Sequence, residues 1–406
     1  MEATNPGFWK LYGEAAVTAA GFFWKAGWAF VLGYWISAMI QAFVPRQRLA
    51  KFMGDADLRS VSLATLFGAA SSSCSFAALA TARALVLKGV HFIAAVAFMF
   101  ASTNLVIELG VLIAIFLGWQ FLVAELAGGL VLIAISSILI KLTYPRRWLS
   151  EAREKVEGQS GDERDFDWRE RISSREGWNL VGHRFVSDWK MVWEEILIGF
   201  TVAGFIAVFV PPWFWEKVFL LEFRGQIPDW LVVVENAMVA PFVAATTFIG
   251  SMGNIPLATV LNANGVLFAG IMGFIYSDLM VPPLVMINAK YYGWRVALYI
   301  AGIMYVSIVI TALALHYLFA AFGITPASSR RVENVTQFAL DYTFFLNILF
   351  VVLAAVLVLL HRRHTRDERA DSHKQSWTNL APKQFAALFA MVLLCTGLAA
   401  STLRNL

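Results

Sequence analysis

Residues 68–76 read GAASSSCSF and residues 246–254 read TTFIGSMGN. Each stretch of small and polar residues interrupts an apolar segment at its centre, the first within residues 61–87 and the second within residues 231–262. An irregular backbone at membrane depth is tolerated only where protein or a water-filled cavity surrounds it, because lipid cannot satisfy its N–H and C=O groups. We therefore expect each segment to form two half-helices whose tip lies inside a bundle of other helices.

The rest of the chain is apolar enough to lie in a membrane over most of its length. Of its 406 residues, 59% are hydrophobic and 15% are charged, and the mean hydropathy is +0.65. A helix needs about 20 apolar residues to cross the hydrocarbon core. Eight segments meet this length: 19–44, 90–117, 120–142, 191–210, 265–286, 294–321, 341–360 and 384–403. The sequence therefore predicts an all-α polytopic membrane protein and excludes a disordered chain.

Clusters of basic residues indicate the orientation of the spans. They follow the first, third and seventh spans: Arg46, Arg48, Lys51 and Arg59; Arg146 and Arg147; Arg362, Arg363, Arg366 and Arg369. By the positive-inside rule these ends are cytoplasmic. The number of crossings between these clusters then decides the topology of the interrupted segments. Segment 61–87 must enter and leave from the cytoplasm, and segment 231–262 must enter and leave from outside. We therefore predict two re-entrant helical hairpins and periplasmic N- and C-termini, the alternative being one kinked span in place of each hairpin.

The two interrupted segments belong to an internal repeat. Ala78-Leu79-Ala80-Thr81 aligns with Pro256-Leu257-Ala258-Thr259, and Leu117-Gly118-Trp119 aligns with Tyr292-Gly293-Trp294, at an offset between 175 and 178 residues. Each half then reads as span, hairpin, span, span, and the halves have opposite orientations. This inverted-topology repeat is typical of secondary transporters, whose substrate sites lie at broken helices near the midplane.

The repeat divides the chain into four parts. Residues 1–143 form the first membrane repeat, residues 144–190 a charged cytoplasmic linker, and residues 191–321 the second, inverted repeat. Residues 322–406 add two C-terminal spans that are joined by a basic cytoplasmic loop, 361–383. The roles of the linker and of the last two spans are not readable from the sequence.

The first tip offers a thiol among hydroxyl groups. Cys74 stands beside Ser72, Ser73 and Ser75. Small hydroxyl side chains offer hydrogen bonds without bulk, and the positive end of a half-helix beginning at Phe76 favours a thiolate. Soft sulfur ligands suit thiophilic metal or metalloid species. We therefore predict that these four residues line a substrate site, although a lone membrane cysteine is more often an inert packing residue.

The second tip and the spans supply the other candidates. Met252 falls opposite Cys74 in the repeat and would add a second soft sulfur, with Gly253 and Asn254 lining the same site. Ionisable groups inside a span are expensive and mark ion pathways. Asp278, beside Pro282-Pro283, is therefore the main candidate for proton coupling, and Asn104 occupies the equivalent place in the first half. Glu108, Glu125 and Glu235 rank below Asp278 because they could reach the membrane interface.

At these same residues the chain resembles the ArsP-like predicted permease family. The first hairpin of that family carries Cys-Ser-Cys-Gly followed by Pro-Leu-Ala, and here Ser72-Ser73-Cys74-Ser75 and Ala78-Leu79-Ala80 occupy those places. The second hairpin keeps Gly253 and Pro256-Leu257-Ala258. The resemblance, which covers roughly residues 15–320, implies an inner-membrane efflux permease for trivalent arsenicals, including methylated ones, that are bound through cysteine thiols. With Ser72 in place of the first cysteine, one thiol is available for this role instead of two.

The sequence thus predicts an alternating-access efflux permease of the bacterial inner membrane, with a trivalent arsenical such as methylarsenite as its substrate. The expected partners are the lipid bilayer, the small solute and coupling protons, and a homo-oligomer is left open. No cofactor, metal site, nucleic-acid partner or enzymatic activity is expected, since no nucleotide-binding or catalytic motif occurs. Two alternatives stay open: a channel or uptake permease for a small sulfur-containing anion, and a membrane-embedded thiol enzyme or a scaffold.

Overall fold

The computed structural model describes residues 7–43, 57–71, 75–87, 89–143, 168–326, 332, 336, 338, 340–368 and 382–405. Every regular element within these ranges is a helix, so the all-helical fold class is confirmed. Seven helices are long and apolar enough to cross a membrane, and a bent pair would make an eighth. The molecule therefore contains a multi-pass membrane bundle.

The described residues of the first half of the chain form six helices. They are α1 (Phe8–Phe43), α3 (Leu58–Ser71), α4 (Ser75–Leu87), α5 (Phe92–Asn104), α6 (Ile107–Phe116) and α7 (Trp119–Thr143). Helices α5 and α6 form the bent pair, with an angle of 42° between them. Helix α3 ends at Ser71 and α4 begins at Ser75, on the two sides of the predicted first tip. Ser72, Ser73 and Cys74 lie outside the described residues.

The second half begins with α9 (Trp168–Ser173) and α10 (Arg175–Phe209). It continues with α11 (Pro212–Val218), the 3-10 turn η1 (Leu221–Phe223), α12 (Asp229–Thr247), α13 (Ser251–Ala263), α14 (Phe268–Ile275), the 3-10 turn η2 (Tyr276–Met280), α15 (Pro282–Tyr292) and α16 (Trp294–Ala321). Two further helices follow, α18 (Tyr342–Glu368) and α19 (Pro382–Asn405). The break between α12 and α13 lies at the predicted second tip.

Two of the predicted spans are parts of longer helices. The sequence places the starts of these spans at residues 19 and 191, whereas α1 begins at Phe8 and α10 at Arg175. At 36 and 35 residues, these helices are about 50 Å long, compared with a hydrocarbon core of about 30 Å. The additional turns of α1 and α10 carry polar residues. A search for continuous apolar segments leaves these turns out, although a helix can continue through them outside the hydrocarbon core. The predicted spans 120–142 and 294–321 match α7 and α16 closely.

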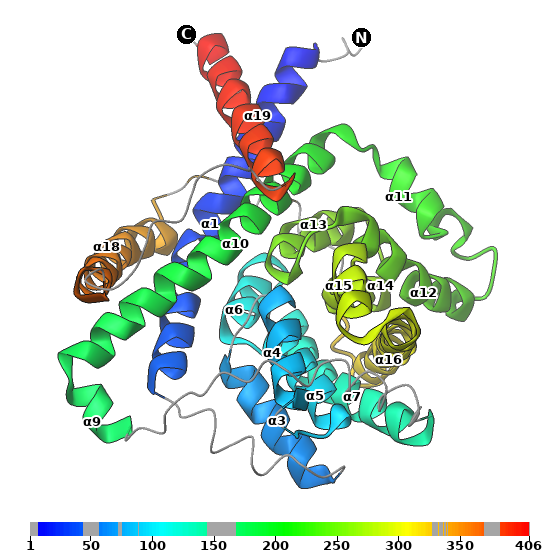
Figure 1. Ribbon diagram of the computed structural model, residues 1–406. Coiled ribbons are helices and arrows are strands. Elements are labelled where there is room, and N and C mark those ends of the chain that lie inside the picture. Colours follow the sequence, from blue (N-terminus) through cyan, green and yellow to red (C-terminus); the bar gives the residue numbers. More distant parts are fainter. Residues whose placement is uncertain are drawn as a thin grey trace.

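Helices α1 and α10 cross near the middle of the molecule and separate α18 from the helices α3–α7 and α12–α16 (Figure 1). At this crossing Phe22 of α1, Phe116 of α6 and Phe200 of α10 pack edge to face, with ring centroids 5.7–6.4 Å apart. All three rings are fully buried. Aromatic pairs of this geometry add about 1 kcal/mol each beyond the area they bury, so the crossing is a rigid centre of the core.

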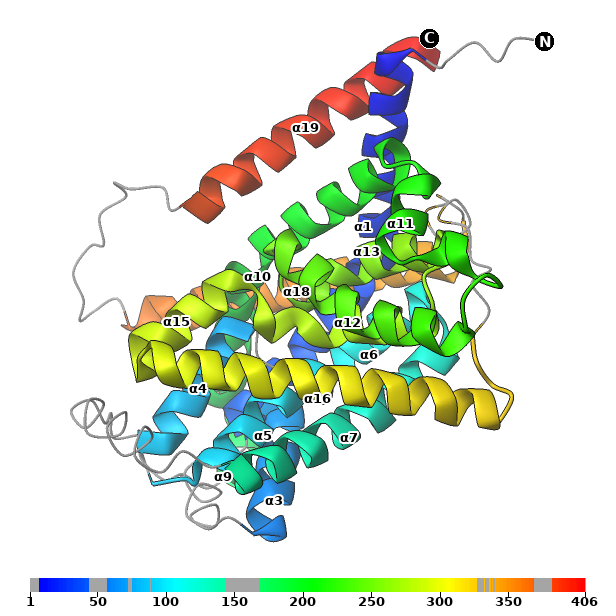
Figure 2. The same ribbon diagram turned by 90° about the vertical axis from the view of Figure 1, so that its right-hand side faces the viewer.

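The outer helices present apolar side chains to their surroundings. Exposed leucine, valine and phenylalanine residues cover α18, as at Phe345 and Val351, and a similar set covers α7 and α16. This is the composition expected where lipid is the solvent. The start of α1 and the end of α19 lie side by side at one end of the molecule (Figures 1 and 2), where the Tyr12 hydroxyl donates a hydrogen bond to Leu393 O over 3.0 Å.

Candidate functional site

The candidate site is organised around a break in the middle of the α14–α15 span. Pro282 lacks an N–H group and its ring forces the preceding residue, Val281, out of the helical conformation, to φ −60° and ψ 139°. The backbone before it tightens into the 3-10 turn η2. Asp278 lies in this turn with 0% of its surface exposed. The predicted ion-coupling residue is therefore at a helix break and fully buried.

The start of α4 meets Asp278 at this break. Ser75, the first residue of α4, donates a hydrogen bond from its hydroxyl to Asp278 Oδ2 over 2.9 Å, although 203 positions separate the two residues in the chain. Asp278 Oδ1 has no hydrogen-bond partner within the described residues. Two residues that the sequence assigned to different roles, substrate lining and ion coupling, thus share one contact.

Helix α7 contributes a second buried carboxyl group. Glu125 is 0% exposed, and neither of its carboxyl oxygens has a hydrogen-bond partner within the described residues. The Tyr276 hydroxyl fixes the neighbouring backbone by donating to Ala124 O at 2.9 Å and to Glu125 O at 3.3 Å. The carboxyl groups of Glu125 and Asp278 are near enough for their negative charges to repel each other. Glu125 therefore faces the bundle interior.

Helix α10 contributes Glu195, which lies against the second tip. A Cβ atom built at Gly250 would lie 2.5 Å from Glu195 Oε2, so the carboxylate packs against the residue that precedes α13. Negative charge is favourable at a helix N-terminus. Glu195 also interacts electrostatically with Asp278. We call Ser75, Glu125, Glu195 and Asp278 the carboxyl cluster; it draws on α4, α7, α10 and η2.

The second tip is held by its own hydrogen bonds. Asn254 Nδ2 donates to Ile249 O over 3.1 Å, and Asn254 Oδ1 accepts from the Thr247 hydroxyl over 3.2 Å. Phe248 turns the chain with φ +55°, a left-handed conformation that is uncommon for such a residue. Asn254 is fully buried and both ends of its side-chain amide are used within the turn. Its observed contacts therefore stabilise the turn.

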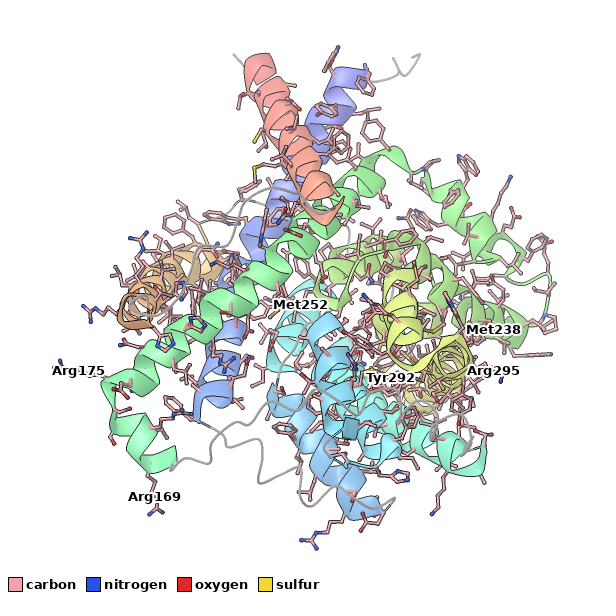
Figure 3. The ribbon with its side chains drawn as sticks, viewed as in Figure 1. Arg169, Arg175, Met238, Met252, Tyr292 and Arg295 are labelled. Atoms are coloured by element: carbon pink, nitrogen blue, oxygen red, sulfur yellow. The ribbon has the colours of Figure 1, made fainter. Side chains whose placement is uncertain are left out.

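The rest of the second tip packs against α10. A Cβ atom at Gly199 would lie 2.6 Å from Gly253 Cα, so the two backbones are in direct contact. Met252 is half-buried, packs against the apolar core and lies toward the middle of the molecule (Figure 3). Its predicted partner Cys74 is outside the described residues, so their pairing stays a prediction.

Asn104 ends α5 at the break before α6. Its Nδ2 group donates to Phe100 O and Thr103 Oγ1, over 3.1 and 3.2 Å, so both donated bonds stay within α5. Its Oδ1 atom has no partner within the described residues. Glu108, one turn later, is 1% exposed and packs against Gly33 of α1. The break in the first half thus has its own buried polar groups, and Asn104 shares no hydrogen bond with Asp278.

An open cavity lies away from the carboxyl cluster. It has a volume of about 840 Å³ and lies at the end of the molecule that carries the start of α1 and the end of α19. Lys10 and Glu14 line it, and so do Ala263 and Asn264 at the end of α13. Glu125 and Asp278 do not border this cavity and are fully buried. The carboxyl cluster is therefore closed to solvent in this conformation.

Burial brings two acidic residues into the cluster that the sequence does not favour. The sequence ranks Glu125 below Asp278, because an ionisable residue near a span end can reach the interface, and it does not single out Glu195. The signal for Glu195 was available, since it lies inside the predicted span 191–210, where an ionisable group is expensive. Tyr276 was also not singled out, and an aromatic residue in an apolar span carries no distinguishing signal.

The bundle of apolar helices, broken at buried polar residues, defines a multi-pass membrane protein. A sequence model described as "Predicted permease", that of the ArsP family, matches residues 12–317. The chain belongs to this family. It is 37% identical over 328 residues to "Putative permease Rv2963" of Mycobacterium tuberculosis, which covers 78% of this chain and 80% of that protein.

A second relative is more distant. "UPF0718 protein YraQ" of Escherichia coli is 29% identical over 139 residues, which are 34% of this chain and 39% of that protein. No solved structure matches the chain. The family and the membrane bundle together support a transporter, in agreement with the sequence.

Proposed function

We propose that this permease is a secondary transporter that exports a small thiophilic solute, a trivalent arsenical such as methylarsenite, from the cytoplasm by alternating access. The observation that carries the proposal is the hydrogen bond between Ser75 and Asp278. It joins the first tip to the break in the opposite half, so substrate-lining and ion-coupling residues are in contact. Such a contact is what coupling of solute to ion movement requires.

The proposed architecture is an inverted-topology repeat with two re-entrant hairpins. Its support is the agreement of helix limits between the halves: α4 and α13 begin at Ser75 and Ser251 and end at Leu87 and Ala263. These limits are separated by the offset that the sequence repeat predicts. Helix α12 has 19 residues and is apolar enough to cross the membrane alone, so its length fits a crossing as well as a hairpin arm.

The substrate follows from the thiol at the first tip and from the family resemblance. In this proposal Cys74 binds the arsenic atom through sulfur, because thiolates are preferred ligands of soft metalloids. Ser72, Ser73, Ser75, Met252, Gly253 and Asn254 line the site around it. Asp278 takes up and releases the coupling proton, with Asn104 at the equivalent break. The protein lies in the bacterial inner membrane with both termini in the periplasm.

The test compares tolerance of methylarsenite in cells that produce the protein with tolerance in cells that produce Cys74→Ala. We expect higher tolerance with the natural chain and loss of that gain with Cys74→Ala. Cys395→Ala is the matched control, because Cys395 is exposed on α19 and lies far from the tips in sequence. Equal tolerance with and without the protein would reject the arsenical. Flux of a sulfur oxyanion that persists in Cys74→Ala would favour the channel or uptake permease.

A further inference from the structure

Glu125 has a feature that distinguishes it from most of the acidic residues in the bundle. Its side chain is fully buried, and both of its carboxyl oxygens lack a donor within the described residues. An ionised carboxylate without a donor is expensive to bury, whereas a protonated carboxyl group costs much less. No three His, Cys, Asp or Glu side chains among the described residues are arranged to hold a metal ion. A proton is therefore the cation that fits this position.

The neighbours of Glu125 place a proton acceptor beside it. Asp278 interacts with it electrostatically, and Oδ1 of Asp278 also lacks a partner within the described residues. Helices α7 and η2 also touch at this point, because Tyr276, two residues before Asp278, donates a hydrogen bond to the backbone carbonyl of Glu125. The Ser75 hydroxyl stabilises the charged form of Asp278 by donating to Oδ2.

Other titratable groups face the pair from the surrounding helices. Glu195 of α10 interacts with Asp278, and Tyr276 of η2 interacts with Glu125. The packed helices also carry Glu108 on α6, Glu235 on α12, Lys290 on α15 and His316 on α16. Glu108 interacts with Asp188, and Glu235 accepts a bond from Asn236 over 3.0 Å. Of these groups, Glu195 interacts with Asp278 and Tyr276 with Glu125, so we take Glu125 and Asp278 as the central pair.

We propose that Glu125 and Asp278 exchange the coupling proton, with Glu195 as the group that passes it toward the second tip. In the exchange, the O–H bond of protonated Glu125 breaks and an O–H bond forms on Asp278 Oδ1. The negative charge moves from Asp278 to Glu125, and no electron or other group is transferred. A side-chain rotation or one water molecule can bridge the two carboxyl groups. This inference rests on the proposed transport function and adds Glu125 and Glu195 to its coupling residues.

The first experiment reads protonation directly and needs no substrate. Infrared spectra of the purified full chain are recorded in H2O and D2O, and the C=O stretch of protonated carboxyl groups is measured. We expect this band at neutral pH in the natural protein and its partial loss in Glu125→Gln. Glu235→Gln is the control, and it should leave the Glu125 contribution in place. Glu125→Asp, which keeps a carboxyl group, should shift the band. A spectrum unchanged by Glu125→Gln would overturn the proposal.

The second experiment separates proton coupling from solute binding. Proteoliposomes are loaded with methylarsenite, and its movement is followed under a pH gradient and in exchange at equal concentrations. Glu125→Gln should reduce gradient-driven movement by about tenfold or more, as for loss of a proton-transfer group, while exchange continues. Full gradient-driven movement in Glu125→Gln would overturn the proposal. If the natural protein moves no methylarsenite, the substrate assignment fails, and the infrared result still decides the role of Glu125.

Discussion

The two tips differ in where their hydrogen bonds go. At the second tip, Asn254 bonds to Thr247 and Ile249 within the same turn. At the first tip, Ser75 bonds across the molecule to Asp278. The second tip is therefore stabilised by its own residues and by direct packing against α10. The first tip is connected to the break that carries the buried carboxyl group.

This difference indicates that the two tips have different roles. A turn whose amide groups are all used locally keeps its shape when its surroundings change. A turn that bonds to an ionisable side chain responds when that side chain changes charge, because the strength of the hydrogen bond depends on the charge of the acceptor. We therefore expect the second tip to act as a fixed part and the first tip to respond to Asp278.

The largest effect should come from filling the contact between α10 and the second tip. Gly199→Leu would place a side chain where Gly253 Cα already lies, since even a Cβ atom would be 2.6 Å from it. Overpacking of this kind costs about 3 kcal/mol or more when backbone must move. We expect loss of folded protein or a large drop in the melting temperature measured in detergent. Gly302→Ala is the control, because no atom lies within 4 Å of a Cβ there. A normal melting temperature for Gly199→Leu would contradict the fixed role of this tip.

The next effect should come from the amide of the second tip. Asn254→Ala removes the donor to Ile249 O and the acceptor for Thr247, and leaves buried polar groups without partners. Each such loss costs about 1–3 kcal/mol. Asn104→Ala, measured in the same way, should cost less because Asn104 Oδ1 has no partner among the described residues. Equal destabilisation by the two substitutions would show that the second tip does not depend on its local bonds.

Ser75→Ala should have a smaller effect on stability and a clearer effect on pH dependence. It removes the one hydroxyl donor to Asp278 Oδ2, at a cost of about 1.5–3 kcal/mol for a bond to a charged group. Because the bond favours ionised Asp278, its loss should move the proton uptake of Asp278 to higher pH. The measurement is transport against pH, with Ser251→Ala, at the equivalent position of α13, as the control. An unchanged pH profile would argue against a responsive first tip.

The smallest effect concerns the first turns of α3 and α12. The exposed Asp57 carboxylate accepts from the Ser60 backbone N–H over 2.8 Å, and the hydrogen bonds from Ser60 lower the pKa of Asp57. Its contribution to stability is present above the unfolded pKa and is lost as the pH falls through the folded pKa. Helix α12 starts after Pro228, which makes no side-chain cap. Hydrogen exchange should therefore speed up in the first turn of α3 on acidification, without a matching change in α12. Asp57→Asn should remove this pH dependence.

Much of the fold was predictable because a helix that crosses lipid needs a long apolar segment, which is visible in the sequence. Long apolar runs gave α7 and α16 closely, and the small polar stretches marked both helix breaks. The early starts of α1 and α10 were not predictable, because their first turns are not continuously apolar. Only the part of a helix inside the hydrocarbon core must be apolar, so the sequence does not show how far the helix continues beyond it.

The site was only partly predictable for a different reason. Asp278 stood out as an acidic residue inside a span, and Ser75 as a hydroxyl at a break, but their contact joins residues 203 positions apart. Nothing in one sequence states which of several acidic residues face the interior. Glu125 shows this, since its position near a span end also fits a residue at the interface, and only packing against η2 places it inside. Cys74, the main substrate prediction, lies outside the described residues and remains a prediction.

The glycine pair at positions 199 and 253 has a mechanical consequence. With no side chain between the two backbones, neither helix can slide or roll on the other without first separating, because there is no deformable layer to shear. Helix α10 and the second tip should therefore move together as one rigid body. Any hinge that lets the two halves of the molecule move must therefore lie elsewhere, and the 42° bend between α5 and α6 is one described break at which we expect it.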